Sequence, residues 1–220
     1  MAHLAVVSAG LRSPSSTRTL ADRLAEASER ALPGPVETTV VEVREHAHAI
    51  ADALLTGFTS GDLEAALTAV QEADAVIVVT PTFQASYAGL FKSFVDLVAP
   101  NTLRGTPVLL AATGGSERHS LVVEHALRPL FSYLGAATVP TGVYAATADF
   151  GDGALALDRR IDRAASELAA LTAGPGSGRG LSAVANVSDD PLTEARRTLG
   201  RASGGDIGDF GDVLRSLGQR

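Results

Sequence analysis

The sequence predicts an α/β domain built on a parallel sheet of five strands with helices on both faces. Five short apolar runs recur along residues 3–144, and segments with helical periodicity lie between them. This alternation is typical of a parallel sheet that is buried on both sides. The predicted strands are His3–Val7, Val36–Val43, Ala75–Thr80, Val108–Ala112 and Thr138–Tyr144.

The gaps between these strands contain apolar residues at helical spacing. Leu20, Leu24 and Ala27 share one face of a helix that follows the first strand. Two helices are expected between the second and third strands, because a glycine-containing break separates two periodic stretches there. The helices predicted after the first one cover residues 45–55, 62–73, 90–98, 122–134 and 157–171.

Strands and helices in this succession fit the flavodoxin-like three-layer sandwich, whose parallel strands lie in the order 2-1-3-4-5. The last helix carries Arg159, Arg160 and Asp162, which we expect on its solvated side. The prediction therefore covers both the layers of the domain and the order of its strands.

The composition changes after this last helix. We assign residues 1–173 to the domain and residues 174–220 to a glycine-rich linker and a tail. Phe210, Val213, Leu214 and Leu217 predict a short amphipathic helix in the tail. Two interpretations remain open: a loosely docked terminal helix, or a strip that binds a neighbouring subunit or a partner.

The composition also excludes several classes of protein. The chain has no cysteine, which excludes a disulfide, a thiolate nucleophile and a cysteine-ligated iron–sulfur cluster. A net charge of −7 argues against nucleic acid as a partner, because such a surface needs a basic footprint. No apolar run approaches a membrane span, and the first residues lack a signal-peptide pattern. We expect a cytoplasmic protein without a membrane partner, and we assign no metal site.

The hydroxyl-rich stretch Ser8–Thr17 links the first strand to the first helix. Free N–H groups at a helix start and the positive end of its dipole favour a phosphate group. Ser15, Ser16 and Thr17 add hydroxyl donors, and Arg12 adds a charged fork. A simpler interpretation is that Ser15 or Ser16 is only an N-cap, which needs a single hydroxyl.

Two further loops follow the third and fourth strands, and all three loops meet at the carboxyl edge of the sheet. Residues 81–89 offer a proline, an aromatic ring and polar side chains suited to a polyol and a heterocycle edge. Residues 113–119 begin with paired glycines, which allow a flat ring to approach the backbone closely. A phosphate, a polyol and a planar ring together describe flavin mononucleotide (FMN).

Four segments carry a resemblance to a known family. They are LRSPSSTR at 11–18, TPTFQASYAGLFK at 80–92, ATGGSERH at 112–119 and HALRPLFSYLG at 125–135. With these segments in order, residues 3–172 resemble the flavodoxin-like NAD(P)H-dependent FMN reductases, in particular the branch that partners two-component flavin-dependent monooxygenases.

The resemblance implies cofactor-binding roles for residues in each of the three loops. Those of the first loop, where the last four would hold the phosphate, are Ser8, Arg12, Ser15, Ser16 and Thr17. Those of the second loop, beside the ribityl chain and the ring, are Pro81, Thr82, Phe83, Gln84 and Ser86. Those of the third loop, where the last three would flank the ring, are Thr113, Gly114, Gly115 and Ser116. Gly10 departs from the serine that is usual in the family.

The family often forms dimers or tetramers through the helix around residues 118–135. In this branch the helix can contain a π-bulge near the position of His125, and such bulges often mark functional sites. The resemblance makes His125 a candidate for flavin exchange or subunit contact, although a histidine packed at an interface fits equally well. His119 is expected to orient the third loop.

The implied reaction is hydride transfer from NADPH or NADH to FMN, with the reduced flavin supplied to a partner monooxygenase. We assign no catalytic acid or base, because the cofactor carries this chemistry and the protein orients the two rings. The nicotinamide is expected to stack over the exposed flavin face near Phe83 and Tyr87.

Two alternatives share the fold. A quinone, azo or chromate reductase would use the same FMN site but keep its FMN bound. A flavodoxin-type electron carrier would have no NAD(P)H site of its own, and its phosphate loop is usually rich in threonine.

Overall fold

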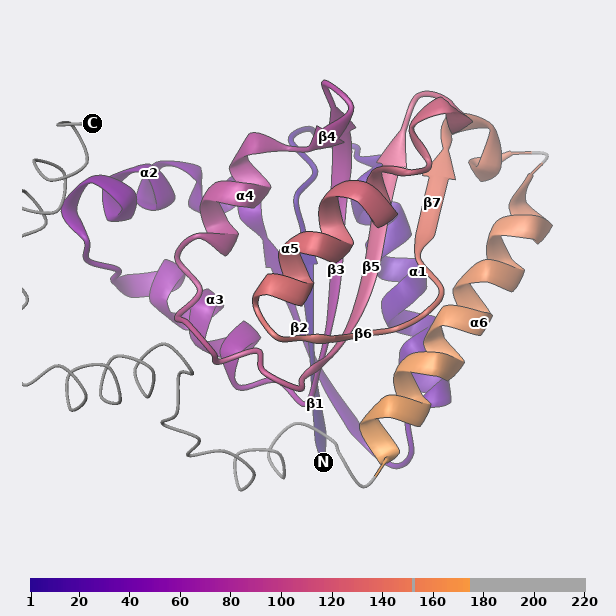
Figure 1. Ribbon diagram of the computed structural model, residues 1–220, viewed down its shortest axis with the longest axis horizontal. Helices are drawn as coiled ribbons and strands as arrows, with labels where there is room; N and C mark the ends of the chain where they lie inside the picture. The colour runs from indigo at the N-terminus through magenta and orange to yellow at the C-terminus, as the bar shows by residue number, and fades with distance from the viewer. Residues whose placement is uncertain (152, 175–220) are drawn as a thin grey trace, which may run out of the picture. The chain divides into compact units, whose positions relative to one another are not determined.

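The computed structural model describes residues 1–151 and 153–174, which form a twisted sheet covered by helices on both faces (Figure 1). The strands are β1 (Ala2–Ser8), β2 (Val36–Glu42), β3 (Ala75–Phe83), β4 (Ser86–Tyr87), β5 (Pro107–Gly114), β6 (Ala137–Thr138) and β7 (Val143–Ala146). The α-helices are α1 (Ser16–Ala31), α2 (Ala47–Thr56), α3 (Gly61–Gln71), α4 (Gly89–Val95), α5 (Arg128–Tyr133) and α6 (Ala154–Ala173). Short 3₁₀ turns are η1 (Val43–His46), η2 (Glu117–His119) and η4 (Thr147–Phe150), and the π-helix is η3 (Val123–Leu127).

The order of the strands confirms the predicted flavodoxin-like fold. The sheet runs β2-β1-β3-β5-β6, with β7 also paired to β5, and these pairings are parallel. With β6 and β7 taken together as the fifth strand, this is the order 2-1-3-4-5. The predicted count of five strands is wrong, because the sheet has seven.

The first of the two additional strands arises because the predicted fifth strand is divided. The predicted strand Thr138–Tyr144 is broken into β6 and β7, which pair with opposite ends of β5. Pro140 lies in the break and has no N–H for the ladder. Gly142 follows, and a Cβ at that position would lie 2.4 Å from Cγ1 of Val123. The π-helix therefore packs directly against the broken strand.

Two charged side chains hold the break from opposite faces of the sheet. The Arg128 guanidinium donates to the carbonyls of Val139 (2.9 Å) and Pro140 (3.1 Å), while Glu124 pairs with it. On the other face, the Glu167 carboxylate accepts from the backbone N–H of Thr141 at 2.7 Å and from its hydroxyl at 2.8 Å. The segment between β6 and β7 is thus fixed although it leaves the ladder.

The second additional strand is β4, which forms a hairpin with β3. β3 continues past Thr80 to Phe83, and Thr82 and Phe83 pair antiparallel with the two residues of β4. Gln84 and Ala85 form the turn with φ of 49° and 61°, a left-handed pair typical of type I′ hairpins. Such turns usually contain asparagine or glycine, so Gln84 and Ala85 did not indicate a turn here.

Two apolar cores separate the three layers. Alternate residues of β1 point to opposite faces, so that Ala5 and Val7 join one core and Leu4 and Val6 the other. The first core lies against α2, α3, α4 and α5, and the second lies against α1 and α6 (Figure 1). The three-layer prediction is therefore confirmed.

Smaller differences concern the helices. The helix expected over 45–55 begins with the turn η1 before α2. Arg159 and Asp162 are exposed as expected, but Arg160 is only partly so, because its guanidinium turns back to the Asp149 carboxylate at 3.3 Å. The last described element ends at Ala173, and the predicted linker and tail helix lie outside the described residues. None of the helices in the described part of the chain has the length and apolar character needed to cross a bilayer.

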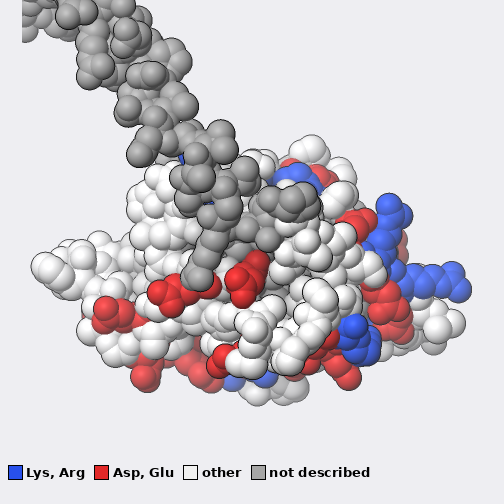
Figure 2. Space-filling view, turned by 90° about the horizontal axis from the view of Figure 1, so that it is seen from below, with Lys and Arg blue, Asp and Glu red and all other residues white. Residues whose placement is uncertain are grey.

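The amino edge of the sheet carries many carboxylates. Figure 2 views the domain from this edge, and acidic side chains spread over the visible face while basic ones gather mainly at one side. This distribution agrees with the net charge of −7.

We expect Arg128→Ala to lower the free energy of unfolding by about 2 kcal/mol, because two carbonyls lose a charged donor and Glu124 loses its partner. Urea unfolding of the purified variant measures this. The matched control is Arg159→Ala on the exposed side of α6, which should stay within about 0.5 kcal/mol of the wild type. Equal midpoints for all three proteins would contradict the role given to Arg128.

Glu167 predicts a pH dependence of stability. Burial raises the pKa of Glu167, but the hydrogen bonds from Thr141 and the nearby Arg163 outweigh it, so that the pKa is lowered below its ordinary value. A carboxyl with a lowered pKa in the folded state stabilises the fold above its ordinary pKa, and this contribution disappears as the pH falls through the lowered value. Glu167→Gln should therefore be less stable than the wild type at pH 7, and the difference should shrink below about pH 4. A constant difference from pH 7 to pH 3 would contradict this assignment.

Candidate functional site

A cavity of about 450 Å³ opens at the carboxyl edge of the sheet, at the upper end of the strands in Figure 1. Its wall comes from the carboxyl ends of β3 and β5 and from the segments that follow β1, β5 and β7. The lining residues are Leu11, Arg12, Pro14, Ser15, Ser16, Thr17, Pro81, Thr82, Phe83, Thr113, Gly114, Gly115 and Thr147. Arg12 is the charged residue among them, and no carboxylate of the described chain lines the cavity. The wall therefore suits an anionic group.

The start of α1 supplies donors at one end of this cavity. Ser15 is the N-cap, and its hydroxyl accepts from the N–H of Arg18 at 3.4 Å. The capping interpretation is thus correct for Ser15, yet Ser15, Ser16 and Arg12 also line the cavity. Ser15 fills the space beside Gly10, where a Cβ would lie 2.2 Å from Oγ of Ser15. This contact explains how the chain accommodates a glycine at the position where a serine was expected.

Arg18 does not take part in the wall. Its guanidinium pairs with Asp22 at 2.6 Å and with Glu42 at the end of β2. Hydrogen bonds and charges from these carboxylates raise the pKa of Arg18. Arg12 is left as the cation that faces the cavity.

A buried hydrogen bond joins the first and third loops. The hydroxyls of Thr17 and Thr113 lie 2.8 Å apart, and the two residues are 2% and 3% exposed. Thr17 is in the first turn of α1, and Thr113 is near the end of β5. The bond therefore holds the start of α1, the candidate phosphate site, against the loop that contains Gly114 and Gly115.

The second loop is anchored at Thr80 and open at Phe83. The Thr80 hydroxyl accepts from the N–H of Ala88 at 3.0 Å and donates to the carbonyl of Pro81 at 3.1 Å. Two residues further on, the Thr82 hydroxyl is buried and has no hydrogen-bond partner within the described residues. Phe83 is 47% exposed at the cavity wall. The loop thus offers an exposed aromatic ring to the cavity, whereas the Thr82 hydroxyl is closed off from that space.

The third loop presents backbone instead of side chains. Gly114 and Gly115 line the cavity, and nothing lies within 4 Å of a Cβ built on Gly115. A planar group can therefore lie directly against this backbone. Gly114 is more constrained, because a Cβ there would lie 2.1 Å from the hydroxyl of Tyr144.

Comparison with known proteins shows the family of the chain. A family model described as NADPH-dependent FMN reductase matches residues 2–151. The chain belongs to this family. The resemblance recognised in the sequence is confirmed, and the chain is an NAD(P)H-dependent FMN reductase.

Individual relatives agree with this assignment. The reductase is 46% identical over 140 residues to the NADH-dependent FMN reductase SfnF of Pseudomonas fluorescens, covering 62% of this chain and 75% of the relative. It is 41% identical over 171 residues to FMN reductase (NADPH) of Pseudomonas aeruginosa, covering 76% and 91%. The X-ray structure of an oxidoreductase from Corynebacterium diphtheriae superposes with a TM-score of 0.76 at 45% identity, covering 78% of this chain and 97% of that one.

The cavity of the reductase collects most of the site residues predicted from the sequence. Four of them do not line it. Ser8 is fully buried at the end of β1, and its hydroxyl has no partner within the described residues. Gln84 and Ser86 lie in the hairpin beyond Phe83, and Ser116 lies beyond the two glycines.

Three lining residues were missed. Leu11 and Pro14 belong to the first loop but lack the polar groups that drew attention to their neighbours. Thr147 directly follows β7, and it would have been found by extending the carboxyl-edge rule to the fifth strand.

The two histidines lie away from the cavity. His119 is exposed in η2, and His125 is exposed within the π-helix over Val123–Leu127. The predicted π-bulge is confirmed, while the roles proposed for both histidines stay predictions. Tyr87 does not line the cavity either, because its ring packs on Phe91 with centroids 5.9 Å apart.

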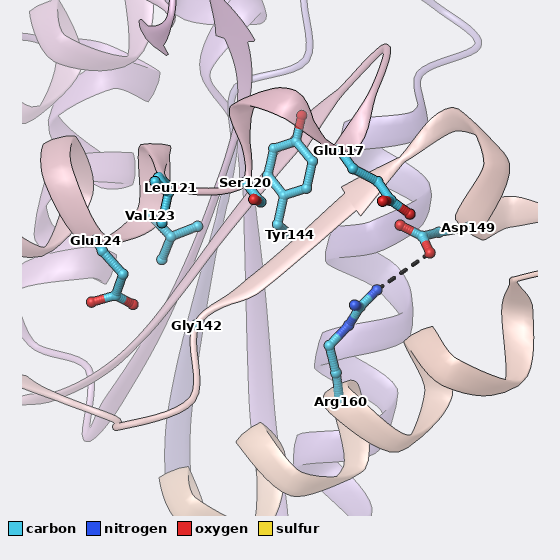
Figure 3. A pocket seen from close by; sticks show the side chains of 9 residues that line it. All are labelled: Glu117, Ser120, Leu121, Val123, Glu124, Gly142, Tyr144, Asp149 and Arg160. Carbon is cyan, nitrogen blue, oxygen red and sulfur yellow. Dashed lines mark ion pairs between the residues drawn. The ribbon is translucent and has the colours of Figure 1, made fainter.

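A second cavity of about 420 Å³ lies beside the first, between the third loop and α6 (Figure 3). Its lining residues are Glu117, Ser120, Leu121, Val123, Glu124, Gly142, Tyr144, Asp149 and Arg160. Asp149 is paired with Arg160, and its other oxygen accepts from the N–H of Ala146 at 2.8 Å. Tyr144 belongs to both neighbourhoods, because it lines this cavity and touches Gly114 of the first.

The hydrogen bond between Thr17 and Thr113 can be measured by a double-mutant cycle. Thr17→Val and Thr113→Val should each lower the free energy of unfolding by about 1–3 kcal/mol, because each leaves a buried hydroxyl unpaired. The double variant should lose less than the sum of the two, by about 1 kcal/mol. Urea unfolding of the four proteins gives the coupling, and strictly additive losses would contradict the bond.

Proposed function

We propose that the cavity at the carboxyl edge binds FMN, with the phosphate at the start of α1 and the ring between the second and third loops. The observation that carries this proposal is the composition of the wall: Arg12 and the Ser15 and Ser16 hydroxyls line one part of it, and bare glycine backbone lines another.

Each part of the wall then has a separate task. N–H groups at the start of α1, together with Arg12, hold the dianionic phosphate. Pro81 and Thr82 form the part of the wall beside the polyol. The Gly114–Gly115 backbone permits close approach of the ring, with an N–H group available to its edge.

FMN supplies the ring that takes up the hydride of NAD(P)H. The protein contributes orientation and exclusion of water. Phe83 is 47% exposed at the mouth, and we propose that it contacts the nicotinamide stacked on the open face of the ring. No side chain needs to donate or remove a proton at the carbon that gives up the hydride.

We further propose that the reduced flavin leaves the protein and supplies a flavin-dependent monooxygenase. The residues expected at the phosphate and the ring include the exposed Arg12, Ser16 and Gly115, which suits a flavin that enters and departs. The SfnF and SfnE relatives are named as FMN reductases, without a further acceptor in their names. We also propose that the protein acts in the cytoplasm as a homo-oligomer.

The test is steady-state oxidation of NADH and NADPH with the concentration of free FMN varied. We expect a rate that saturates with FMN, as for an exchangeable substrate. A rate independent of added FMN would favour a quinone, azo or chromate reductase with bound flavin. Failure to oxidise either nucleotide would favour an electron carrier and would overturn the proposal.

Arg12→Ala should raise the KM for FMN by about tenfold at nearly unchanged kcat, because the charged contact is made in binding and not in the chemical step. The matched control is Arg159→Ala, which removes an equal charge from the far helix α6. A KM that does not change in Arg12→Ala would place the phosphate elsewhere.

A further inference from the structure

Tyr144 occupies the centre of β7 and is 8% exposed. Its phenol donates a hydrogen bond to the carbonyl of Ser116 at 2.7 Å. The bond reaches from the sheet to the third loop, two residues beyond Gly114. Within the described chain, no other side chain hydrogen-bonds to the backbone of residues 115–121.

The same hydroxyl lies directly behind the wall of the FMN cavity. A Cβ built on Gly114 would lie 2.1 Å from this oxygen and 3.7 Å from Cβ of Thr82. Gly114 and Thr82 line the cavity from the third and second loops. The Tyr144 hydroxyl therefore stands at the junction of the two loops that are proposed to hold the ring.

The opposite side of Tyr144 is hollow. Its ring lines the second cavity together with Glu117 of the third loop and the adjoining Ser120, and Figure 3 shows the phenol pointing from β7 toward that loop. Close-packed side chains do not fill the space below this part of the loop. Because the cavity leaves this part of the loop without packing, its position depends on individual hydrogen bonds. The bond from the Tyr144 hydroxyl to the Ser116 carbonyl is one of them.

The phenol is suited to a permanent donor role. Burial raises the pKa of Tyr144 above its ordinary value. The group therefore stays protonated throughout the neutral range, and the Ser116 carbonyl keeps its partner.

We propose that Tyr144 is a positioning residue for the flavin ring. Its hydrogen bond to Ser116 keeps the Gly114–Ser116 backbone in the position in which the ring can lie against it. This inference rests on the proposed binding of FMN in the first cavity. It gives a binding function to a side chain that does not itself line that cavity.

The main test is Tyr144→Phe, which keeps the ring and removes the donor. We expect the dissociation constant for FMN, measured by quenching of flavin fluorescence, to rise about tenfold. The KM for FMN should rise by a similar factor while kcat changes little, because saturating flavin restores the bound state. The unfolding temperature of the apoprotein should fall by no more than about 4 °C.

The matched control is Tyr133→Phe, which removes the same hydroxyl from a side chain that is 89% exposed. It should leave the FMN affinity unchanged. If Tyr144 only fills the core, Tyr144→Phe will also bind FMN as tightly as the wild type, and that result overturns the inference. Wild-type protein that fails to bind FMN would instead overturn the proposed function.

A second variant tests the contact with Gly114. Gly114→Ala places a methyl group against the Tyr144 hydroxyl, so that we expect a large loss of FMN affinity in the wild-type background. In the Tyr144→Phe background the closest clashing atom is gone, and the same substitution should weaken binding by a smaller factor. Equal factors in the two backgrounds would contradict the contact.

Discussion

The hydrogen bond between Thr17 and Thr113 connects two segments that are 96 positions apart in the chain. It is possible because β1, β3 and β5 are parallel and end at the same edge, with Ser8 beside Val79 and Pro81 beside Thr113. The start of α1 and the glycine loop are thereby held next to each other at one opening. The opening therefore combines an anion site with exposed glycine backbone, and a ligand with both an anionic group and a planar ring can contact the two together.

The broken fifth strand extends this arrangement to the far side of the opening. Arg128 and Glu167 hold the segment around Pro140 from the two faces of the sheet, and the π-helix packs on Gly142. β7 then resumes beside the end of β5, which places Tyr144 under the third loop and Thr147 in the cavity wall. An irregular strand thus delivers two residues to the neighbourhood of the site.

Much of this could be predicted from the sequence, since its strongest signals are periodic. Apolar runs that alternate with helical patterns predicted the layers and the strand order, and the segments at the carboxyl ends of β1, β3 and β5 were correctly expected to meet. The predictions failed where tertiary contacts decide local structure. The left-handed Gln84–Ala85 turn has no glycine, and Pro140 interrupts a strand that its neighbours favour. Tyr144 was missed because a tyrosine inside an apolar strand looks like a core residue, and its hydroxyl gains meaning only beside Ser116.

The central claim is that the anion site at the start of α1 and the bare backbone of the third loop bind one molecule. Equilibrium titration of the protein with FMN and with riboflavin tests it most directly, because the two ligands share the ring and the polyol and differ in the phosphate. FMN should bind at least about tenfold more tightly than riboflavin, because charge-assisted hydrogen bonds are lost with the phosphate. Equal affinities for the two ligands, or no binding of either, would contradict it.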